Sequence, residues 1–236
     1  MAVPVVDPER YPAQLEAKRA RISQRFAGLS PPALEVFASP ASHYRMRCEF
    51  RIWHEGDELF YAMFEVDPDD PGQKRVIRLD QYPVASEAIN ALMPRLLEAI
   101  RDRPRLRRKL FQAEFLTTLS GEALVTLIYH RPLDAAWEAE AQWLQAHLGV
   151  ALIGRARKQR QVLDRDHVWE RLAVDDMTLV YQQVENSFTQ PNAEINRAML
   201  GWARSATRDS MVIPAPPRSR CPCCPRPGKS SPLRSP

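Results

Sequence analysis

Arginines at alternate positions mark the segment from residue 45 to residue 51. Arg45, Arg47 and Arg51 are interleaved with apolar residues, which are Tyr44, Met46, Cys48, Phe50 and Ile52. A strand sends alternate side chains to opposite faces, so this pattern predicts one buried face and one face that carries the guanidinium groups. Their spacing suits the phosphates of a nucleic-acid backbone. The alternative is a solvated sheet face on which Glu49 pairs with its neighbours.

A denser basic run precedes Phe111. Its members are Arg101, Arg103, Arg105, Arg107, Arg108 and Lys109, and a shorter run contains Arg155, Arg157, Lys158 and Arg160. Runs of charge are usually solvated surface, but a run that leads into an aromatic residue is typical of sites that hold phosphates and stack a base. On pattern alone, Phe111 fits a core position and His130 fits a strand end with an ordinary hydrogen bond.

Amide and hydroxyl side chains gather in residues 181–192, where a β-type run is followed by helix signals. Backbone N–H groups at such a junction lack partners, and a nearby glutamine or asparagine can reach a polar ligand over the edge of the sheet. The alternative is that Asn186, Thr189 and Asn192 form only turn and cap hydrogen bonds.

The four cysteines predict neither a metal site nor a nucleophile. Cys48 lies in the predicted strand among arginines, whose charge favours a lowered pKa for its thiol. Cys221, Cys223 and Cys224 crowd a proline-rich stretch without a following histidine, whereas a zinc site takes four well-spaced ligands. We therefore expect no metal, and we assign no catalytic residue.

The net charge of +4 comes from the end of the chain. Residues 207–236 hold six arginines and lysines against one aspartate, a balance of +5 that leaves −1 for residues 1–206. RNA binding must therefore be argued from local groups of charge. The sequence has no signal peptide and no run long enough to span a membrane, so we expect a cytoplasmic protein with reduced thiols and no membrane partner.

The remaining pattern predicts an α+β fold, with a largely antiparallel sheet and flanking helices. Strands are expected over residues 44–52, 59–66, 75–79, 111–119, 123–130, 150–163 and 177–184. Helices are expected from Asp7-Pro8 to about Gly28, over residues 89–100 with a kink at Pro94, after Asp134 and after Asn192. Residues 207–236 are rich in proline and lack apolar periodicity, so we expect them to be disordered.

Several motifs together resemble the S-adenosylmethionine-dependent tRNA uracil-5-methyltransferases, which methylate the T-loop uridine. Residues 183–192, Gln-Val-Glu-Asn-Ser-Phe-Thr-Gln-Pro-Asn, are similar to the family signature just upstream of the methyl-donor domain. Residues 39–54 are similar to the family's N-terminal hairpin. Shorter matches are residues 109–112, 116–120, 129–130 and 152–156.

The resemblance implies roles for particular residues. Contacts with the T-arm of tRNA are expected at Arg45, Arg47 and Arg51. Phe111 and His130 are expected to stack on T-loop bases, which offsets the stacking that is lost when the target uridine flips out. Gln190 matches the first contact of the family with the methyl donor, S-adenosylmethionine.

The resemblance stops after about Arg204. We therefore expect a tRNA-recognition domain over residues 1–185 and the start of a methyltransferase domain over residues 186–206, with its Rossmann-like remainder missing. The composition of residues 207–236 is typical of a GC-rich gene read out of frame, so a frameshift is a hypothesis. On this interpretation the chain is a truncated, inactive, monomeric form that keeps tRNA binding. The alternatives are a stand-alone T-arm-binding module and a non-functional fragment.

Overall fold

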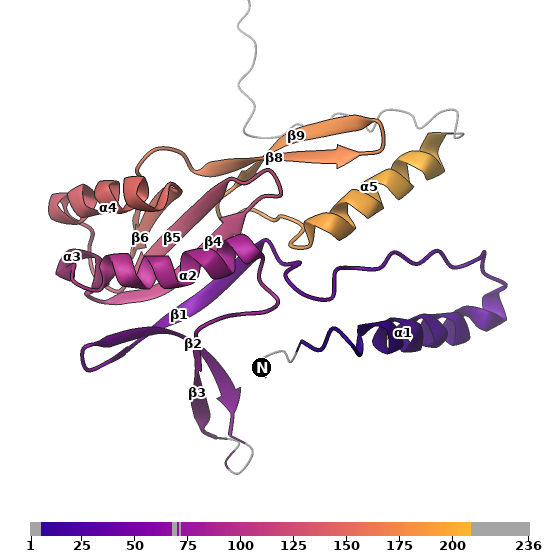
Figure 1. Ribbon diagram of the computed structural model, residues 1–236, viewed down its shortest axis with the longest axis horizontal. Coiled ribbons are helices and arrows are strands. Elements are labelled where there is room, and N and C mark those ends of the chain that lie inside the picture. Colours follow the sequence, from indigo (N-terminus) through magenta and orange to yellow (C-terminus); the bar gives the residue numbers. More distant parts are fainter. Residues whose placement is uncertain (1–5, 68–69, 71, 209–236) are drawn as a thin grey trace, which may run out of the picture. The chain divides into compact units, whose positions relative to one another are not determined.

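A seven-stranded sheet dominates the computed structural model, which describes residues 6–67, 70 and 72–208 (Figure 1). The strand order is β3-β2-β1-β4-β5-β6-β7, and only the β5–β6 pair is parallel. The strands are β1 (Arg47–Glu55), β2 (Glu58–Val66), β3 (Lys74–Leu79), β4 (Leu110–Thr117), β5 (Ala123–Tyr129), β6 (Ala151–Ala156) and β7 (Gln159–Val162). The prediction of an α+β fold with a largely antiparallel sheet is confirmed.

The other elements are one hairpin and the helices. The hairpin consists of β8 (His167–Val174) and β9 (Met177–Val184). The helices are α1 (Tyr11–Phe26), the 3-10 helix η1 (Ala27–Leu29), α2 (Glu87–Ile100), α3 (Pro104–Arg107), α4 (Ala135–Leu148) and α5 (Ala193–Arg208). Within the described ranges, no helix has the length and apolar character needed to cross a membrane. The chain divides into two compact units, residues 1–201 and 202–236.

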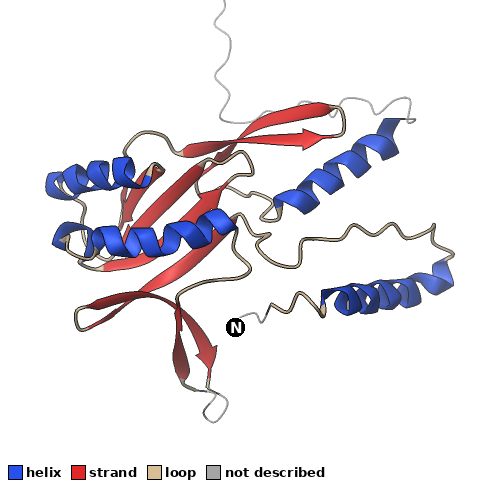
Figure 2. Ribbon diagram, viewed as in Figure 1, coloured by secondary structure: helices blue, strands red, loops and turns tan. Residues whose placement is uncertain are grey.

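Helices α2 and α4 cover one face of the large sheet (Figure 2). Phe50 lies at the centre of this layer, with its ring 5.6 Å from that of Tyr61 and 6.0 Å from that of Phe115. The helices contribute buried side chains, among them Ile89, Met93, Leu96, Trp137 and Leu144. Burial of a large apolar side chain contributes about 1.5–3 kcal/mol, so this layer is the core of the first unit.

Local signals fix where helix α4 begins and how closely it packs. The Asp134 carboxylate accepts a hydrogen bond from the Trp137 backbone N–H at 2.7 Å, which confirms the predicted N-cap. Gly154 of β6 lies against the Trp137 ring. A Cβ atom at position 154 would be 2.2 Å from that ring, so this close approach requires glycine.

The opposite face of the sheet carries the odd-numbered residues of β1, because side chains of a strand alternate. The register pairs Arg51 with Ala62 on β2 and with Gln112 on β4, and it pairs Glu49 with Glu114. Paired residues share a face, so this polar face lies away from α2 and α4. Towards β5 and β6, the hairpin β8–β9 covers it through a small apolar cluster of Leu116, Leu124, Ala151, Ile153 and Val168.

Two strand predictions are wrong. The single strand expected over residues 150–163 is the hairpin β6–β7, whose turn places Lys158 at a φ of 59°. Strand β8 was not predicted, because the fully buried Glu170 interrupts its apolar pattern. The Glu170 carboxylate accepts hydrogen bonds from the backbone N–H groups of Leu119 and Ser120, which accounts for its burial.

Three element boundaries also differ from the prediction. Helix α1 begins at Tyr11, since Asp7 accepts a hydrogen bond from the Arg10 N–H and holds a turn that precedes the helix. Strand β1 begins at Arg47, where its pairing with β4 starts. Helix α2 begins at Glu87 rather than at Ile89, because Ser86 caps it by accepting a hydrogen bond from the Ile89 N–H, and it runs through Pro94 as one element.

Candidate nucleic-acid interface

Arg51, Phe111 and His130 form a stack on the polar side of the sheet. The Arg51 guanidinium carbon lies 3.6 Å from the Phe111 ring centroid, and the His130 and Phe111 centroids are 3.8 Å apart with the rings inclined by 27°. Two groups this close to one ring centroid would collide on the same face, so they occupy opposite faces of Phe111. His130 is exposed, and its outer face ends the stack.

A β-bulge places Phe111 in this stack. Leu110 pairs with Tyr129 and Gln112 pairs with Ile128, which leaves Phe111 as the extra residue. A bulge re-aims the side chain of its extra residue, and Phe111 is accordingly half-buried beside His130 rather than in the core. The alternative of a core position for Phe111 is therefore wrong. The structure brings together Arg51, Phe111 and His130, which are three of the five predicted RNA-binding residues.

Arg45 and Arg47 bond to backbone carbonyls near the start of β1, away from the stack. Arg45 lies before β1, so the prediction that all three arginines share one strand is wrong, and its Nε donates to the Arg47 carbonyl at 2.9 Å. Arg47 Nη1 donates to the Ser187 carbonyl at 2.9 Å, and its Nη2 lies 3.3 Å from the Glu49 carboxylate. Both side chains are therefore held in place through contacts that a phosphate can replace.

Within the signature of residues 183–192, the segment 185–192 is fixed at both ends, and at its start the Glu185 N–H donates a hydrogen bond to the Asp166 carbonyl at 2.8 Å. The Pro191 carbonyl accepts a hydrogen bond from the Met46 N–H at 2.7 Å, and Asn192 caps α5 by accepting from the Ile195 N–H at 3.0 Å. Between these ends, Phe188 is 90% exposed. Gln190 is half-buried, and its amide nitrogen lies 4.0 Å from the Met199 sulfur. Asn192 forms the predicted cap, but its side-chain N–H also donates a hydrogen bond to Ser39 Oγ at 2.6 Å, so the alternative that it forms only turn and cap hydrogen bonds is wrong.

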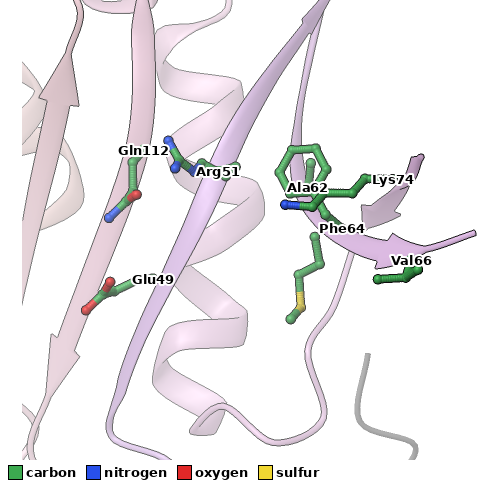
Figure 3. A pocket seen from close by; sticks show the side chains of 8 residues that line it. Glu49, Arg51, Ala62, Phe64, Val66, Lys74 and Gln112 are labelled. Carbon is green, nitrogen blue, oxygen red and sulfur yellow. The ribbon is translucent and has the colours of Figure 1, made fainter. Parts of the chain in front are cut away.

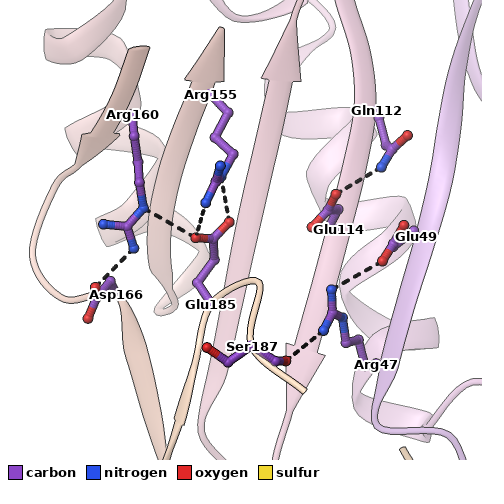
Figure 4. A network of polar contacts seen from close by, with 9 residues as sticks. All are labelled: Arg47, Glu49, Gln112, Glu114, Arg155, Arg160, Asp166, Glu185 and Ser187. Carbon is purple, nitrogen blue, oxygen red and sulfur yellow. Dashed lines mark hydrogen bonds and ion pairs between the residues drawn. The ribbon is translucent and has the colours of Figure 1, made fainter. Parts of the chain in front are cut away.

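Glu185 anchors the start of this segment through two arginines (Figure 4). Its carboxylate accepts two hydrogen bonds of 2.6 Å from Arg155 and one of 3.2 Å from Arg160, and its side chain is only 3% exposed. Arg155 and Arg160 are paired across β6–β7, so Glu185 also relieves their repulsion. The carboxylate raises the pKa of Arg155 by hydrogen bonding. The sequence has no signal for this pair, which joins residues 30 positions apart.

Glu114 lies between these groups and forms no ion pair with another described residue. Gln112 donates a hydrogen bond to it at 2.8 Å. Burial raises the pKa of the Glu114 carboxyl, and the nearby charges of Glu49 and Glu185 raise it further. The polar face is therefore mixed in charge, with carboxylates set between the arginines (Figure 4).

Cys48 is unsuited to nucleophilic chemistry. Burial raises the pKa of its thiol to about 12, an effect that the nearby Arg45 charge only partly opposes. The expectation of a lowered pKa is therefore wrong, because β1 turns Cys48 into the core. Cys221, Cys223 and Cys224 lie outside the described residues, as does the predicted tail of residues 207–236 from residue 209 onward. The prediction that this tail starts at Thr207 is wrong, because α5 extends to Arg208. In the part of the chain that the structure describes, no group of three potential metal ligands occurs.

Comparison with known proteins defines the class of protein as a tRNA-modifying methyltransferase. The family model described as tRNA (Uracil-5-)-methyltransferase matches residues 10–212. This match covers most of the chain, so the chain belongs to the tRNA (uracil-5-)-methyltransferase family.

Individual relatives agree with this assignment. The chain is similar to the tRNA/tmRNA (uracil-C(5))-methyltransferases of Chromohalobacter salexigens (75% identity over 210 residues), Shewanella amazonensis (55% over 214) and Dechloromonas aromatica (56% over 203). The alignments cover 89%, 89% and 86% of this chain and 56%, 57% and 55% of those proteins. The chain thus spans about half the length of the curated relatives it matches.

A solved structure shares the fold. The crystal structure of Pyrococcus abyssi tRNA (uracil-54, C5)-methyltransferase in complex with S-adenosyl-L-homocysteine aligns with a TM-score of 0.54 at 17% identity. The alignment covers 83% of this chain and 48% of that one. At this identity, the likeness supports the fold alone.

Proposed function

We propose that this chain supplies the RNA-binding part of an S-adenosylmethionine-dependent tRNA uracil-5-methyltransferase that acts on the T-loop uridine. Residues 1–185 recognise the tRNA, and residues 186–206 begin the methyl-donor part. Family membership supports the reaction class. The observation that carries the RNA site is the stack of Arg51, Phe111 and His130 on the polar face of the sheet.

The stack offers a prepared platform for an unpaired base. The exposed ring of His130 can receive a base on its outer face, and Phe111 and Arg51 hold that ring from behind. Stacking of one base on an aromatic side chain contributes about 1–3 kcal/mol, which is comparable with the cost of unstacking a base. Arg45 and Arg47 lie towards the Leu116 end of β4, where they can exchange their present contacts for phosphates further along the same RNA strand.

Gln190 and Thr189 fit a role in binding the methyl donor. The Thr189 hydroxyl is buried and has no hydrogen-bond partner among the described residues, and the Gln190 amide has only the distant Met199 sulfur. S-adenosylmethionine supplies an electrophilic methyl group. In the family's reaction, a thiolate adds to C6 of uracil and a carboxylate later removes the C5 proton. We assign neither role to a residue of this chain.

Binding of a T-arm hairpin tests the proposal. Replacing His130 by alanine removes the outer ring of the stack and should weaken binding about tenfold. His147→Ala is the matched control, because His147 is an exposed histidine stacked on Trp143 in α4. Equal affinities for the two variants would contradict the proposed site.

Methyl transfer separates the two functional alternatives. Transfer of a labelled methyl group from S-adenosylmethionine to unmodified tRNA indicates an active methyltransferase. T-arm binding without transfer indicates that this chain serves the same RNA as a binding part alone, which we propose to be monomeric and cytoplasmic. Failure to bind the T-arm hairpin would contradict both.

A further inference from the structure

The large sheet forks where β1 and β2 part. Strand β1 pairs with β2 only from Arg51 to Glu55, and with β4 from Arg47 to Arg51. Ala62 is the last residue of β2 that pairs with β1. After it, β2 pairs with β3 alone, as far as Val66. The hairpin β2–β3 therefore leaves the sheet as an arm (Figure 1).

A pocket of about 320 Å³ lies in this fork (Figure 3). Phe64 and Val66 of β2 line its apolar side. The polar groups around it belong to Glu49, Arg51, Lys74 and Gln112. An apolar wall with a few converging polar groups is the usual make-up of a ligand site.

The polar groups of the pocket keep unused hydrogen-bonding capacity. Gln112 donates its amide N–H to Glu114, which leaves its carbonyl oxygen as an acceptor. Glu49 Oε1 bonds to Arg47, so Oε2 remains available. Arg51 Nη1 is buried and has no hydrogen-bond partner among the described residues. Buried donors of this kind are normally satisfied.

We propose that the fork binds an unstacked base of single-stranded RNA, a site that adds to the proposed T-arm function and rests on it. The base lies against the Phe64 ring, which Trp53 supports edge-on at 5.8 Å. Its polar edge donates to the free oxygens of Glu49 and Gln112 and accepts a hydrogen bond from Arg51 Nη1. The exposed ammonium of Lys74 contacts the adjoining phosphate. Aromatic faces combined with edge contacts and cations are the means by which proteins hold single-stranded RNA.

The position of Arg51 ties this pocket to the stack. Arg51 lines the pocket and also lies over Phe111, so a base in the fork and a base on His130 belong to one strand of RNA. A peptide strand fits the fork less well. Such a strand binds through main-chain pairing, which would leave the buried Arg51 donor and the Lys74 charge unused.

Matched variants of β2 and β3 test the pocket. Phe64→Leu should weaken binding of a T-arm hairpin about tenfold, and Lys74→Gln about three- to fivefold. Arg75→Gln is the control, because it removes the same charge from the next position on the opposite face of β3, where Arg75 lies 3.4 Å from Glu65. Its affinity should stay within about twofold of the parent protein. Phe64→Trp keeps an aromatic face and should retain binding, which excludes misfolding as the cause of the Phe64→Leu loss.

An abasic scan of the hairpin loop identifies the occupant. At one loop position, removal of the base should abolish the difference between the parent protein and Phe64→Leu, because contacting partners are non-additive. Two results would overturn the pocket alone. One is binding that depends on Arg51 but is insensitive to Phe64→Leu and Lys74→Gln. The other is an abasic scan in which no loop position abolishes the difference between the parent protein and Phe64→Leu. Absence of T-arm binding by the parent protein would overturn the proposed function as well.

Discussion

Replacing Glu185 by glutamine removes the charge that joins the hairpin β6–β7 to the signature segment. The side chain is almost fully buried, and it accepts three hydrogen bonds from Arg155 and Arg160. Glutamine keeps the volume but offers one acceptor oxygen, and its NH₂ group faces guanidinium donors. We therefore expect Arg155 and Arg160 to repel each other across the hairpin and residues 185–192 to lose their first anchor.

The magnitude follows from the contacts. A hydrogen bond to a charged group contributes about 1.5–3 kcal/mol, and breaking a fully buried ion pair costs about 3–5 kcal/mol. The side chains of Arg155 and Arg160 are 30% and 37% exposed, so water compensates part of the loss. We expect the free energy of unfolding to fall by about 2–3 kcal/mol, which corresponds to a Tm lower by about 4–12 °C for a chain of this size.

Urea denaturation followed by circular dichroism measures this loss. Asp166→Asn is the control, because Asp166 also bonds to Arg160, at 2.9 Å, but is 39% exposed. Its effect should be below about 1 kcal/mol. The double variant Glu185→Gln/Arg155→Gln should recover part of the loss, since a neutral pair replaces an unpaired cation. A Glu185→Gln protein as stable as the Asp166→Asn protein would refute the anchoring role.

Three further predictions concern packing, pH and helix α5. Gly154→Ala should lower the free energy of unfolding by about 1–3 kcal/mol or more, because the new Cβ would lie 2.2 Å from the Trp137 ring. In the same urea denaturation, the control Gly28→Ala should leave the free energy of unfolding unchanged, because no atom lies within 4 Å of its new Cβ. In the folded protein, the pKa of Glu114 is raised above its ordinary value of 4.5. The stability that its protonated form contributes is therefore present below pH 4.5 and is lost as the pH rises through the folded pKa. Glu114→Gln should be more stable than the parent protein at pH 8, and a less stable variant would contradict the assigned environment. In hydrogen exchange, amides of residues 193–201 should exchange faster than those of residues 47–55, because α5 leaves Met199 52% exposed while β1 pairs with β4 along its first half and with β2 along its second half; equal protection would show that α5 has another stabilising contact.

Local patterns predicted much of the fold because they depend on neighbouring residues. The alternation from Met46 to Ile52 predicted the buried face of β1, and the caps at Asp134 and Asn192 were correctly placed. Side-chain periodicity and capping are properties of a few consecutive positions. The sequence therefore suffices for these features.

The features that build the site depend on pairing between distant segments. The bulge at Phe111 arises from the β4–β5 register, and the fork arises because β2 exchanges β1 for β3 as its partner. The Glu185–Arg155 pair requires β9 and β6 to be brought together by the fold. Family resemblance selected Phe111 and His130, but their mutual stacking and the Arg51 contact follow only from the structure.

The salt dependence of T-arm binding tests the central claim most directly. Arg51 adds a positive charge to the proposed RNA interface, so Arg51→Ala should weaken binding and reduce the slope of log K against log salt concentration by about 0.7–0.9. Arg19→Ala, on the exposed helix α1, should leave the slope unchanged. Equal slopes for the parent protein and Arg51→Ala would contradict the assignment of this face to RNA.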